Sequence, residues 1–223
     1  MKKVLIISAH PDDETLGAGG TLLKHKSNGD KIYWVIITKP YEKDGFTKDF
    51  CNERKKEILK VSSFYQFSDV FELDFPARKL DSSNLPNMIE LLSSIFQKIK
   101  PEIIYSLNRS DAHSDHRLVF NATMACIKSF RYPFIKKVLM YECLSETEFS
   151  PSLSENVFIP NYFVDITNFM DKKLKIMQCF KNQMSDAPFP RSIENISALA
   201  THRGCTCGVK YAESFYLIKY IDK

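Results

Sequence analysis

The stretch Val4-Leu5-Ile6-Ile7-Ser8-Ala9-His10-Pro11-Asp12-Asp13-Glu14 decides the fold of this chain. Its first half is an apolar run that predicts a buried strand, and its second half is a sharp polar turn. Ligands bind at the carboxyl ends of strands in open α/β sheets. The first strand therefore delivers an imidazole and two adjacent carboxylates to that edge. These are the side-chain types that hold a divalent metal and leave a base beside it.

Strand-like and helix-like segments alternate along most of the chain. With short connections, this alternation predicts a doubly wound α/β fold, a mostly parallel twisted sheet with helices on both faces. The expected strands are 3–8, 31–38, 69–73, 102–107, 136–141, 158–165 and 213–221. The expected helices are 15–28, 49–65, 86–100, 116–130, 169–183 and 193–201. The sequence has no repeat or linker, so we expect one domain over residues 1–223.

The composition excludes several functional classes. The net charge of the 223 residues is only +4 and the lysines are scattered, so no basic patch indicates nucleic-acid binding. The first apolar run stops at His10, too early for a signal peptide, and no stretch is long enough to span a bilayer. The six cysteines are irregularly spaced, which favours reduced thiols. We expect a cytoplasmic protein, with the oligomeric state, a homo-oligomer included, left open.

A second polar cluster, Asp111-Ala112-His113-Ser114-Asp115-His116, follows the apolar run Ile103-Ile104-Tyr105-Ser106-Leu107. His10 and Asp13 lie three residues apart in the first turn, close enough to chelate one ion, and His116 supplies a distant third ligand. Two imidazoles and one carboxylate with open coordination positions suit Zn²⁺ and also Fe²⁺. We expect one divalent ion per chain, with Zn²⁺ preferred. Such an ion lowers the pKa of its water to ~7.

The neighbours of these ligands are candidates for proton transfer. Asp12 need not ligate if Asp13 does, so it is free to act as general base. His113 is expected in the loop over the metal, where an imidazolium stabilises an oxyanion or protonates a leaving amine. Asp115 is a candidate to orient His113, as carboxylates behind a site do.

Several of these features have simpler explanations. Asp111 and Asp115 are equally suited to capping a helix, and Glu14 is assigned to the first helical turn, where it complements the helix dipole. The stretch Gly17-Ala18-Gly19-Gly20 lacks the spacing of a phosphate-binding loop. Close packing of the first helix against the sheet explains these glycines better.

The sequence resembles the LmbE-like, or PIG-L, family of metal-dependent N-acetylglucosamine deacetylases. The resemblance covers nearly the whole chain, and its first motif paired with His113-Ser114-Asp115-His116 is specific. Beyond the two polar clusters it rests on Arg54 with Glu57, on Tyr162-Phe163-Val164-Asp165-Ile166-Thr167, on Lys173 and on the tail from Arg203 to Phe215. It implies a Rossmann-like sheet and a zinc-dependent amide hydrolase.

The family pattern also implies roles for single residues. Its metal ligands match His10, Asp13 and His116. Asp12 matches the general base, and His113, supported by Asp115, matches the residue that stabilises the tetrahedral intermediate. Arg54 matches a position that contacts sugar or phosphate in relatives.

One segment departs from the family pattern. Many relatives carry a Pro-Asp pair after the third strand, and that Asp contacts the sugar, whereas this chain reads Pro76-Ala77-Arg78-Lys79. The change predicts a different substrate preference, for instance for an anionic group bound by Arg78. Alternatively, Arg78 and Lys79 are solvated loop charges.

The hypothesis favoured by these residues is a hydrolase that removes the N-acetyl group from a small amino-sugar substrate, free, nucleotide-linked or part of a glycoside. Two alternatives remain. The pattern His10-x-Asp12…His116 also suits the two-histidine, one-carboxylate site of a non-haem iron enzyme. A non-catalytic sugar-binding relative is the other.

Overall fold

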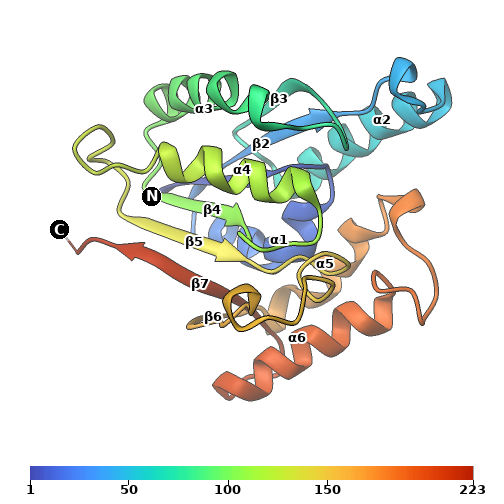
Figure 1. Cartoon of the computed structure of the whole chain (residues 1–223). Coiled ribbons are helices and arrows are strands. Elements are labelled where there is room, and N and C mark those ends of the chain that lie inside the picture. Colours follow the sequence, from blue (N-terminus) through green and yellow to red (C-terminus); the bar gives the residue numbers. More distant parts are fainter. Residues whose placement is uncertain (223) are drawn as a thin grey trace.

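The computed structural model describes residues 1–222, and at its centre lies a seven-stranded sheet in the order β3-β2-β1-β4-β5-β7-β6 (Figure 1). The strands are β1 (Lys3–Ser8), β2 (Lys31–Lys39), β3 (Asp69–Pro76), β4 (Ile103–Leu107), β5 (Lys137–Tyr141), β6 (Tyr162–Asp165) and β7 (Ala212–Tyr220). Strands β1 to β5 pair in parallel, and β7 runs antiparallel to both β5 and β6. The prediction of a mostly parallel α/β sheet is confirmed.

Helices cover both faces of this sheet (Figure 1). They are α1 (Asp13–Ser27), α2 (Lys48–Tyr65), α3 (Leu85–Ile99), α4 (Ser114–Ala125), α5 (Met170–Met177) and α6 (Ile193–Cys207). Helices α3 and α4 pack together on one face, α1 contacts α2 and α5 on the other, and α6 packs beside β7. Within residues 1–222 no helix combines the length and the apolar character needed to cross a membrane.

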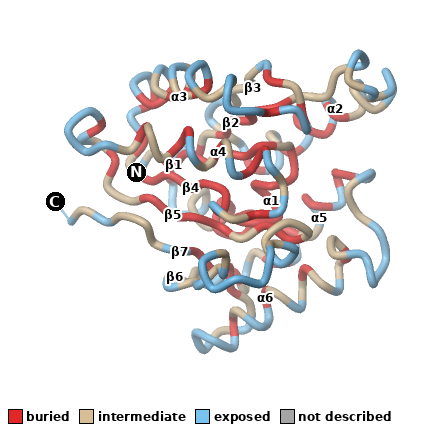
Figure 2. The backbone as a smooth tube through the Cα atoms, in the orientation of Figure 1, coloured by how far each residue is buried: buried red, intermediate tan, exposed pale blue. Residues whose placement is uncertain are grey.

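The core follows the central strands. Val4, Leu5, Ile6 and Ile7 of β1 are all fully buried, and Figure 2 shows the buried backbone concentrated along β1, β4 and β5. A parallel sheet covered on both faces needs apolar side chains on both sides of each strand. This requirement explains why β1 reads as a continuous apolar run instead of an alternating one.

Two strand boundaries differ by more than one residue from those expected. Strand β3 continues beyond residue 73 because it resumes pairing with β2 after an irregularity, with Phe75 opposite Thr38. Strand β6 begins at Tyr162 instead of residue 158. Pro160 precedes it and has no N–H to contribute to a ladder.

The C-terminal ends of three helices also differ from expectation by more than one residue. Helix α4 stops at Ala125, not at residue 130, and the following turn buries Tyr132. Helix α5 stops at Met177, not at residue 183, and the chain beyond it buries Phe180. Helix α6 runs past residue 201 to Cys207 and ends at Gly208, whose φ of 76° is left-handed. In the first two cases core packing outweighs local helix propensity.

The glycines of α1 allow this helix to approach its neighbours closely. A Cβ at Gly17 would overlap the ring of Tyr141 on β5, and a Cβ at Gly20 would meet Ile166 at 2.7 Å. The predicted packing role of these glycines is confirmed. This packing fixes α1 and with it the turn that carries the first polar cluster.

Candidate metal centre and adjoining cavity

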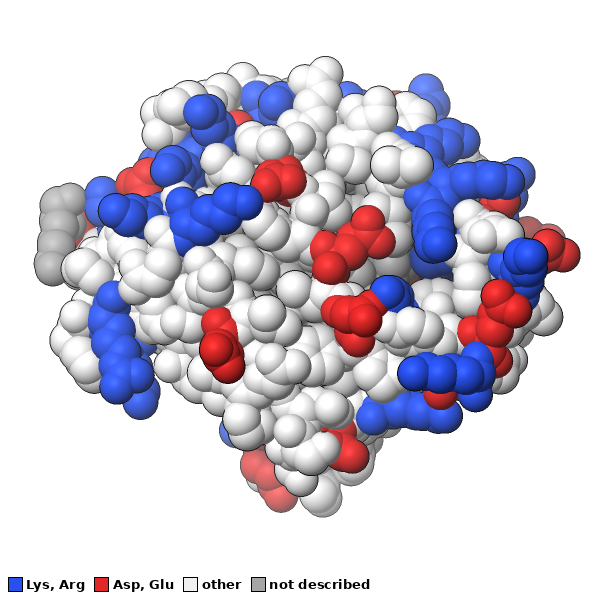
Figure 3. All heavy atoms as spheres, turned by 90° about the horizontal axis from the view of Figure 1, so that it is seen from above, with Lys and Arg blue, Asp and Glu red and all other residues white. Residues whose placement is uncertain are grey.

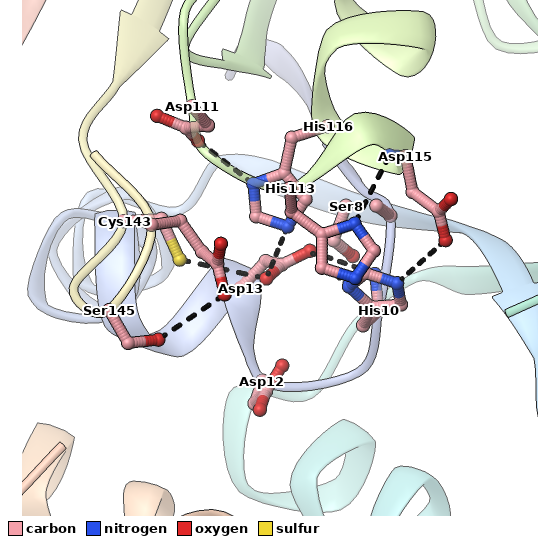
Figure 4. A network of polar contacts seen from close by, with 12 residues as sticks. Ser8, His10, Asp12, Asp13, Asp111, His113, Asp115, His116, Cys143 and Ser145 are labelled. Atoms are coloured by element: carbon pink, nitrogen blue, oxygen red, sulfur yellow. Dashed lines mark hydrogen bonds and ion pairs between the residues drawn. The ribbon is translucent and has the colours of Figure 1, made fainter. Parts of the chain in front are cut away.

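The two polar clusters meet at the carboxyl ends of β1 and β4. These strands are direct neighbours in the sheet, and the chain leaves them in opposite directions, from β1 toward β2 and from β4 toward β5. Ligands of open α/β sheets bind at such a switch point. Figure 4 shows the rings of His10, His113 and His116 near the Asp13 carboxylate, with the Asp12 carboxylate apart from that group.

His10, Asp13 and His116 form a group that could hold a metal ion. One ligand atom from each lies within 4.8 Å of those of the others, and His116 Nε2 is 3.4 Å from Asp13 Oδ1. Two imidazole nitrogens and one carboxylate oxygen are the donor set of many catalytic divalent-metal sites. His10 also belongs to a second such group with His113 and Asp115.

The carboxylate of Asp111 orients the ring of His116 from the side opposite Asp13. Asp111 Oδ2 lies 2.8 Å from His116 Nδ1, which leaves Nε2 facing Asp13. Asp111 itself accepts hydrogen bonds from Asn108 Nδ2 at 2.7 Å and from Thr147 Oγ1 at 2.6 Å. Such a carboxylate fixes the tautomer and orientation of a metal-binding histidine. The alternative that Asp111 caps a helix is therefore wrong.

The electrostatics of this group favour a cation between its ligands. Burial opposes protonation of His116, but Asp13 and Asp111 outweigh it and raise the pKa of His116 to about 10. Burial likewise opposes ionisation of Asp13, but His116 and His10 outweigh it and hold the pKa of Asp13 well below its usual range. A buried site that stabilises positive charge in this way also suits a metal ion.

Asp12 lies outside the ligand group. Its side chain does not cap α1. Its carboxylate instead accepts a hydrogen bond from Arg191 Nη1 at 2.9 Å. Its φ of 129° is a conformation that costs a non-glycine residue about 1–3 kcal/mol and that recurs at functional sites. Burial raises the pKa of Asp12, and the charge of Arg191 opposes that rise.

Glu14 stabilises the turn between β1 and α1 that contains Asp12. It is fully buried and accepts the N–H of Asp12 at 3.0 Å and the hydroxyl of Thr15 at 2.6 Å. Burial raises the pKa of Glu14 to about 8. Glu14 thus lies in the first turn of α1, as expected, and it also holds the backbone of Asp12.

The carboxylate of Asp115 faces His10, not His113. Its Oδ2 lies 3.0 Å from His10 Nε2 and accepts the backbone N–H of Arg78 at 2.7 Å. His113 caps α4, because its Nδ1 accepts the N–H of Asp115 at 3.1 Å. The structure therefore places the Asp115 carboxylate differently from the expected contact with His113, and Asp115 is not the cap. Burial, together with His10 and His116, lowers the pKa of His113 to about 4.

A cavity of about 430 Å³ opens beside this group, a volume within the range of small-molecule sites. The predicted residues that line it are His10, Asp12, Arg54, Arg78 and His113. In Figure 3 acidic and basic side chains lie around a hollow to the right of the centre. A second cavity, about 410 Å³, lies along residues 142–158 and contains none of the predicted site residues.

Arg54 braces one wall of the cavity. It is only 6 % exposed, and its Nη1 donates to the carbonyl oxygen of Pro11 at 2.9 Å and lies 3.2 Å from Glu57 Oε2. It therefore supports the backbone that leads into Asp12. Its predicted contact with a substrate stays a prediction.

Arg191 is the main cavity residue that the sequence did not single out. It lies between α5 and α6 and binds Asp12, Gln183 Oε1 at 2.7 Å and Ser145 Oγ at 2.7 Å. Three segments distant in sequence thus meet over the cavity. The surrounding Pro190-Arg191-Ser192 belongs to no motif, and only the fold reveals its proximity to Asp12.

The fold and this geometry define an α/β protein with a candidate metal centre at the switch point of its sheet. Comparison with known proteins then assigns the family. Residues 5–127 match the family model PIG-L, described as GlcNAc-PI de-N-acetylase. The chain belongs to this family, as its resemblance implied.

Relatives cover most of the chain. A diacetylchitobiose deacetylase of Thermococcus kodakarensis is 23 % identical, over 98 % of this chain and 84 % of the relative. The uncharacterized deacetylase YaiS of Escherichia coli is 30 % identical, over 70 % of this chain and 82 % of the relative. The crystal structure of the conserved protein TT1542 from Thermus thermophilus superposes with a TM-score of 0.80 at 23 % identity, covering 100 % of this chain and 97 % of the other.

One relative carries out a different reaction. A 4-oxalmesaconate hydratase of Pseudomonas putida is 25 % identical, over 82 % of this chain and 74 % of the relative. The fold of the chain is therefore found in relatives named for two kinds of chemistry. The reaction is therefore determined by the residues of the site and not by the fold.

Proposed function

We propose that the protein is a metal-dependent amide hydrolase that removes the N-acetyl group from an amino sugar. One observation carries the proposal: a buried carboxylate, Asp12, lines the cavity together with His10, and it does not belong to the group of His10, Asp13 and His116 that could hold a metal. A metal site with a free base beside it is what hydrolysis of an amide needs. The sugar deacetylases among the relatives support an acetamido sugar as substrate.

His10, Asp13 and His116 would hold the ion, for which the donor set suits Zn²⁺ first and Fe²⁺ second. When bound, the ion supplies a Lewis acid that activates water and polarises the amide carbonyl. The carboxylate of Asp12 takes the proton of the attacking water. The water oxygen forms a bond to the acetyl carbon, the carbon–nitrogen bond breaks, and the proton passes to the amine. The products are acetate and the free amino sugar.

We expect His113 to act as a neutral imidazole, and not as the imidazolium considered from the sequence. Its Nδ1 accepts the N–H of Asp115, so in the neutral ring the hydrogen is on Nε2. Its low pKa agrees with this neutral form. Its ring centroid is 4.5 Å from that of His10 and it lines the cavity. From there Nε2–H donates to the carbonyl oxygen as negative charge develops on it.

The test is acetate release from a panel of N-acetyl sugars, free and nucleotide-linked. Protein loaded with Zn²⁺ or Fe²⁺ is compared with the same protein after chelation. Release that depends on the metal supports the proposal. Oxygen uptake with a 2-oxo acid and no acetate would favour the iron-enzyme alternative, and failure to bind any divalent metal would favour the non-catalytic one.

Addition of water to a carbon–carbon double bond is a second candidate, because a hydratase is among the relatives. The same metal group and the same base would serve that reaction. Loss of the ultraviolet absorbance of a conjugated oxo acid, without acetate release from any sugar, would select it over deacetylation.

A further inference from the structure

We propose that Arg78 binds an anionic group, a carboxylate or a phosphate, on the substrate that occupies the cavity. The inference rests on the proposed function and narrows its substrate class to acidic acetamido sugars. It follows from the charges around the cavity, from the turn that carries Arg78 and from the aromatic wall beneath its guanidinium.

Three arginines line the cavity, and two of them are already occupied. Arg54 faces Glu57, and Arg191 faces Asp12 and Glu146. Arg78 is exposed, and within residues 1–222 no carboxylate lies within ion-pair distance of its guanidinium. Arg78 is therefore the cavity arginine whose charge is available to a ligand.

The adjacent Lys79 differs from Arg78 because its charge is already paired. Its Nζ pairs with Asp44 Oδ1 at 2.8 Å, its side chain is 54 % exposed, and it does not line the cavity. The explanation as a solvated loop charge suits Lys79. Arg78, one residue earlier, lines the cavity and has no such partner among residues 1–222.

The backbone conformation of Arg78 is strained. Its φ of 64° is left-handed, a conformation that non-glycine residues rarely adopt and that is retained where the surroundings enforce it. Asp115 enforces it, because its carboxylate accepts the N–H of Arg78 at 2.7 Å and that of Leu80 at 3.3 Å. The same carboxylate contacts His10. The position of Arg78 is thereby fixed relative to the candidate metal ligands.

An aromatic wall supports the guanidinium. The Arg78 guanidinium lies 4.2 Å from the ring centroid of Phe46, and the rings of Phe46 and Phe50 stack at 5.3 Å. Both rings line the cavity. Ligand sites combine such apolar surface with a few fixed polar groups that set orientation, and a stacked guanidinium presents its planar donors to a carboxylate or phosphate.

The experiment compares matched neutral and anionic substrates on the zinc-loaded protein. The neutral sugar is N-acetylglucosamine. The anionic ones are its 1-phosphate, its 6-phosphate and N-acetylmuramic acid, so that a phosphate and a carboxylate are distinguished. Arg78→Gln removes the charge, Arg78→Lys keeps it, and Lys79→Gln is the matched control at the neighbouring cation. Binding of the deacetylated sugars, namely glucosamine, its 1- and 6-phosphates and muramic acid, is measured by calorimetry and gives a readout that needs no turnover.

We expect the wild type to prefer at least one anionic sugar in kcat/KM. Arg78→Gln should lower the ratio of anionic to neutral kcat/KM by about tenfold to a hundredfold, the range of a hydrogen bond to a charged group. The loss should lie mainly in KM, Arg78→Lys should restore part of it, and Lys79→Gln should leave the ratio unchanged.

Absence of any anionic preference in the wild type, or equal losses on neutral and anionic sugars in Arg78→Gln, would overturn the inference while leaving deacetylation intact. If no sugar releases acetate, the proposed function fails. The calorimetry then still decides about Arg78, because equal binding of all the phosphorylated and carboxylated sugars by wild type and Arg78→Gln contradicts the inference, and a tenfold loss for at least one of them supports it.

Discussion

Neighbouring carboxylates at positions 12 and 13 have opposite surroundings. Asp13 faces two imidazoles, whereas Asp12 faces the guanidinium of Arg191. A sharp turn with a strained φ at Asp12 separates the two side chains. One residue is thereby suited to hold a metal and the next to accept a proton.

This division can be tested by two substitutions. We expect Asp12→Ala to retain one metal ion per chain and to lose about 10²–10⁴-fold in kcat, the usual contribution of a general base. Asp13→Ala should lose the metal itself. Metal content by mass spectrometry and acetate release measured on the same samples separate the two effects. Equal loss of metal in both variants would show that the assignment of roles is wrong.

Asp111 should raise the metal affinity of the site without contacting the ion. Replacement by Asn removes the charge behind the His116 ring, and such changes weaken metal affinity by about 10–100-fold. Competition with a chromogenic chelator measures this. Asp81→Asn, at an exposed carboxylate that caps a 3-10 turn, is the matched control. Unchanged affinity in Asp111→Asn would contradict the role of the Asp111 charge in metal binding.

At the scale of residues, the sequence predicts what is close along the chain. His10, Asp12 and Asp13 share one turn, and their short spacing signals shared chemistry. The hydrogen bond from Asp111 to His116 is also local, yet it was open to a capping explanation until the ring orientation was known. Arg191 is separated from Asp12 by 179 positions, so nothing in its own neighbourhood announces the contact.

Among the elements, α1 begins with Asp13 of the metal group, so the site depends on the placement of this helix. Its glycine at position 17 faces the Tyr141 ring without room for a methyl group. We expect Gly17→Ala to destabilise the protein by about 1–3 kcal/mol, because overpacking outweighs the gain in helix propensity. Urea unfolding measures it, with Ser27→Ala at the exposed end of the same helix as control. A stabilised Gly17→Ala variant would contradict the packing argument.

A buried ion pair ties three elements together. Lys173 of α5 and Glu213 of β7 lie 2.7 Å apart, and Glu213 also accepts the N–H of Gly20 and of Thr21 in α1. Lys173→Met should cost about 3–5 kcal/mol of unfolding free energy, since it leaves a buried carboxylate uncompensated.

Two further variants sharpen this test. Lys172→Met, at the exposed neighbouring lysine, should change the unfolding free energy by less than about 0.5 kcal/mol. Adding Glu213→Gln to Lys173→Met should recover part of the loss, because the buried charge is then gone. Similar unfolding free energies for Lys173→Met and Lys172→Met would refute the structural role of the pair.

Strong hydrophobic periodicity predicts where the strands and helices lie, but it predicts their ends less well. The central strands were recognised because burial on both faces makes them continuous apolar runs. The end of α5 was misplaced because the sequence beyond Met177 still has helical spacing, while burial of Phe180 requires the chain to turn. The antiparallel pairing of β5 with β7 joins segments about 75 residues apart, and no local pattern encodes it.

For the whole molecule, metal binding and folding should be coupled. The metal group joins the β1–α1 turn to the start of α4, so an ion bound there stabilises the folded state by mass action, about 2.7 kcal/mol at a free concentration 100 times the dissociation constant. We expect Zn²⁺ to raise the melting temperature of the wild type. His116→Ala should abolish the increase, and the exposed His202→Ala should retain it. An undiminished increase in His116→Ala would locate the ion elsewhere.

The carboxylate of Asp115 connects the metal group with the turn that carries Arg78. One oxygen atom is shared by the imidazole of His10 and the peptide N–H of Arg78. An ion held by His10 and an acidic group held by Arg78 would both act on this oxygen through its two partners. The two occupancies would then be thermodynamically linked. By reciprocity, whatever factor the metal confers on the affinity for an acidic substrate, the acidic substrate confers on the affinity for the metal.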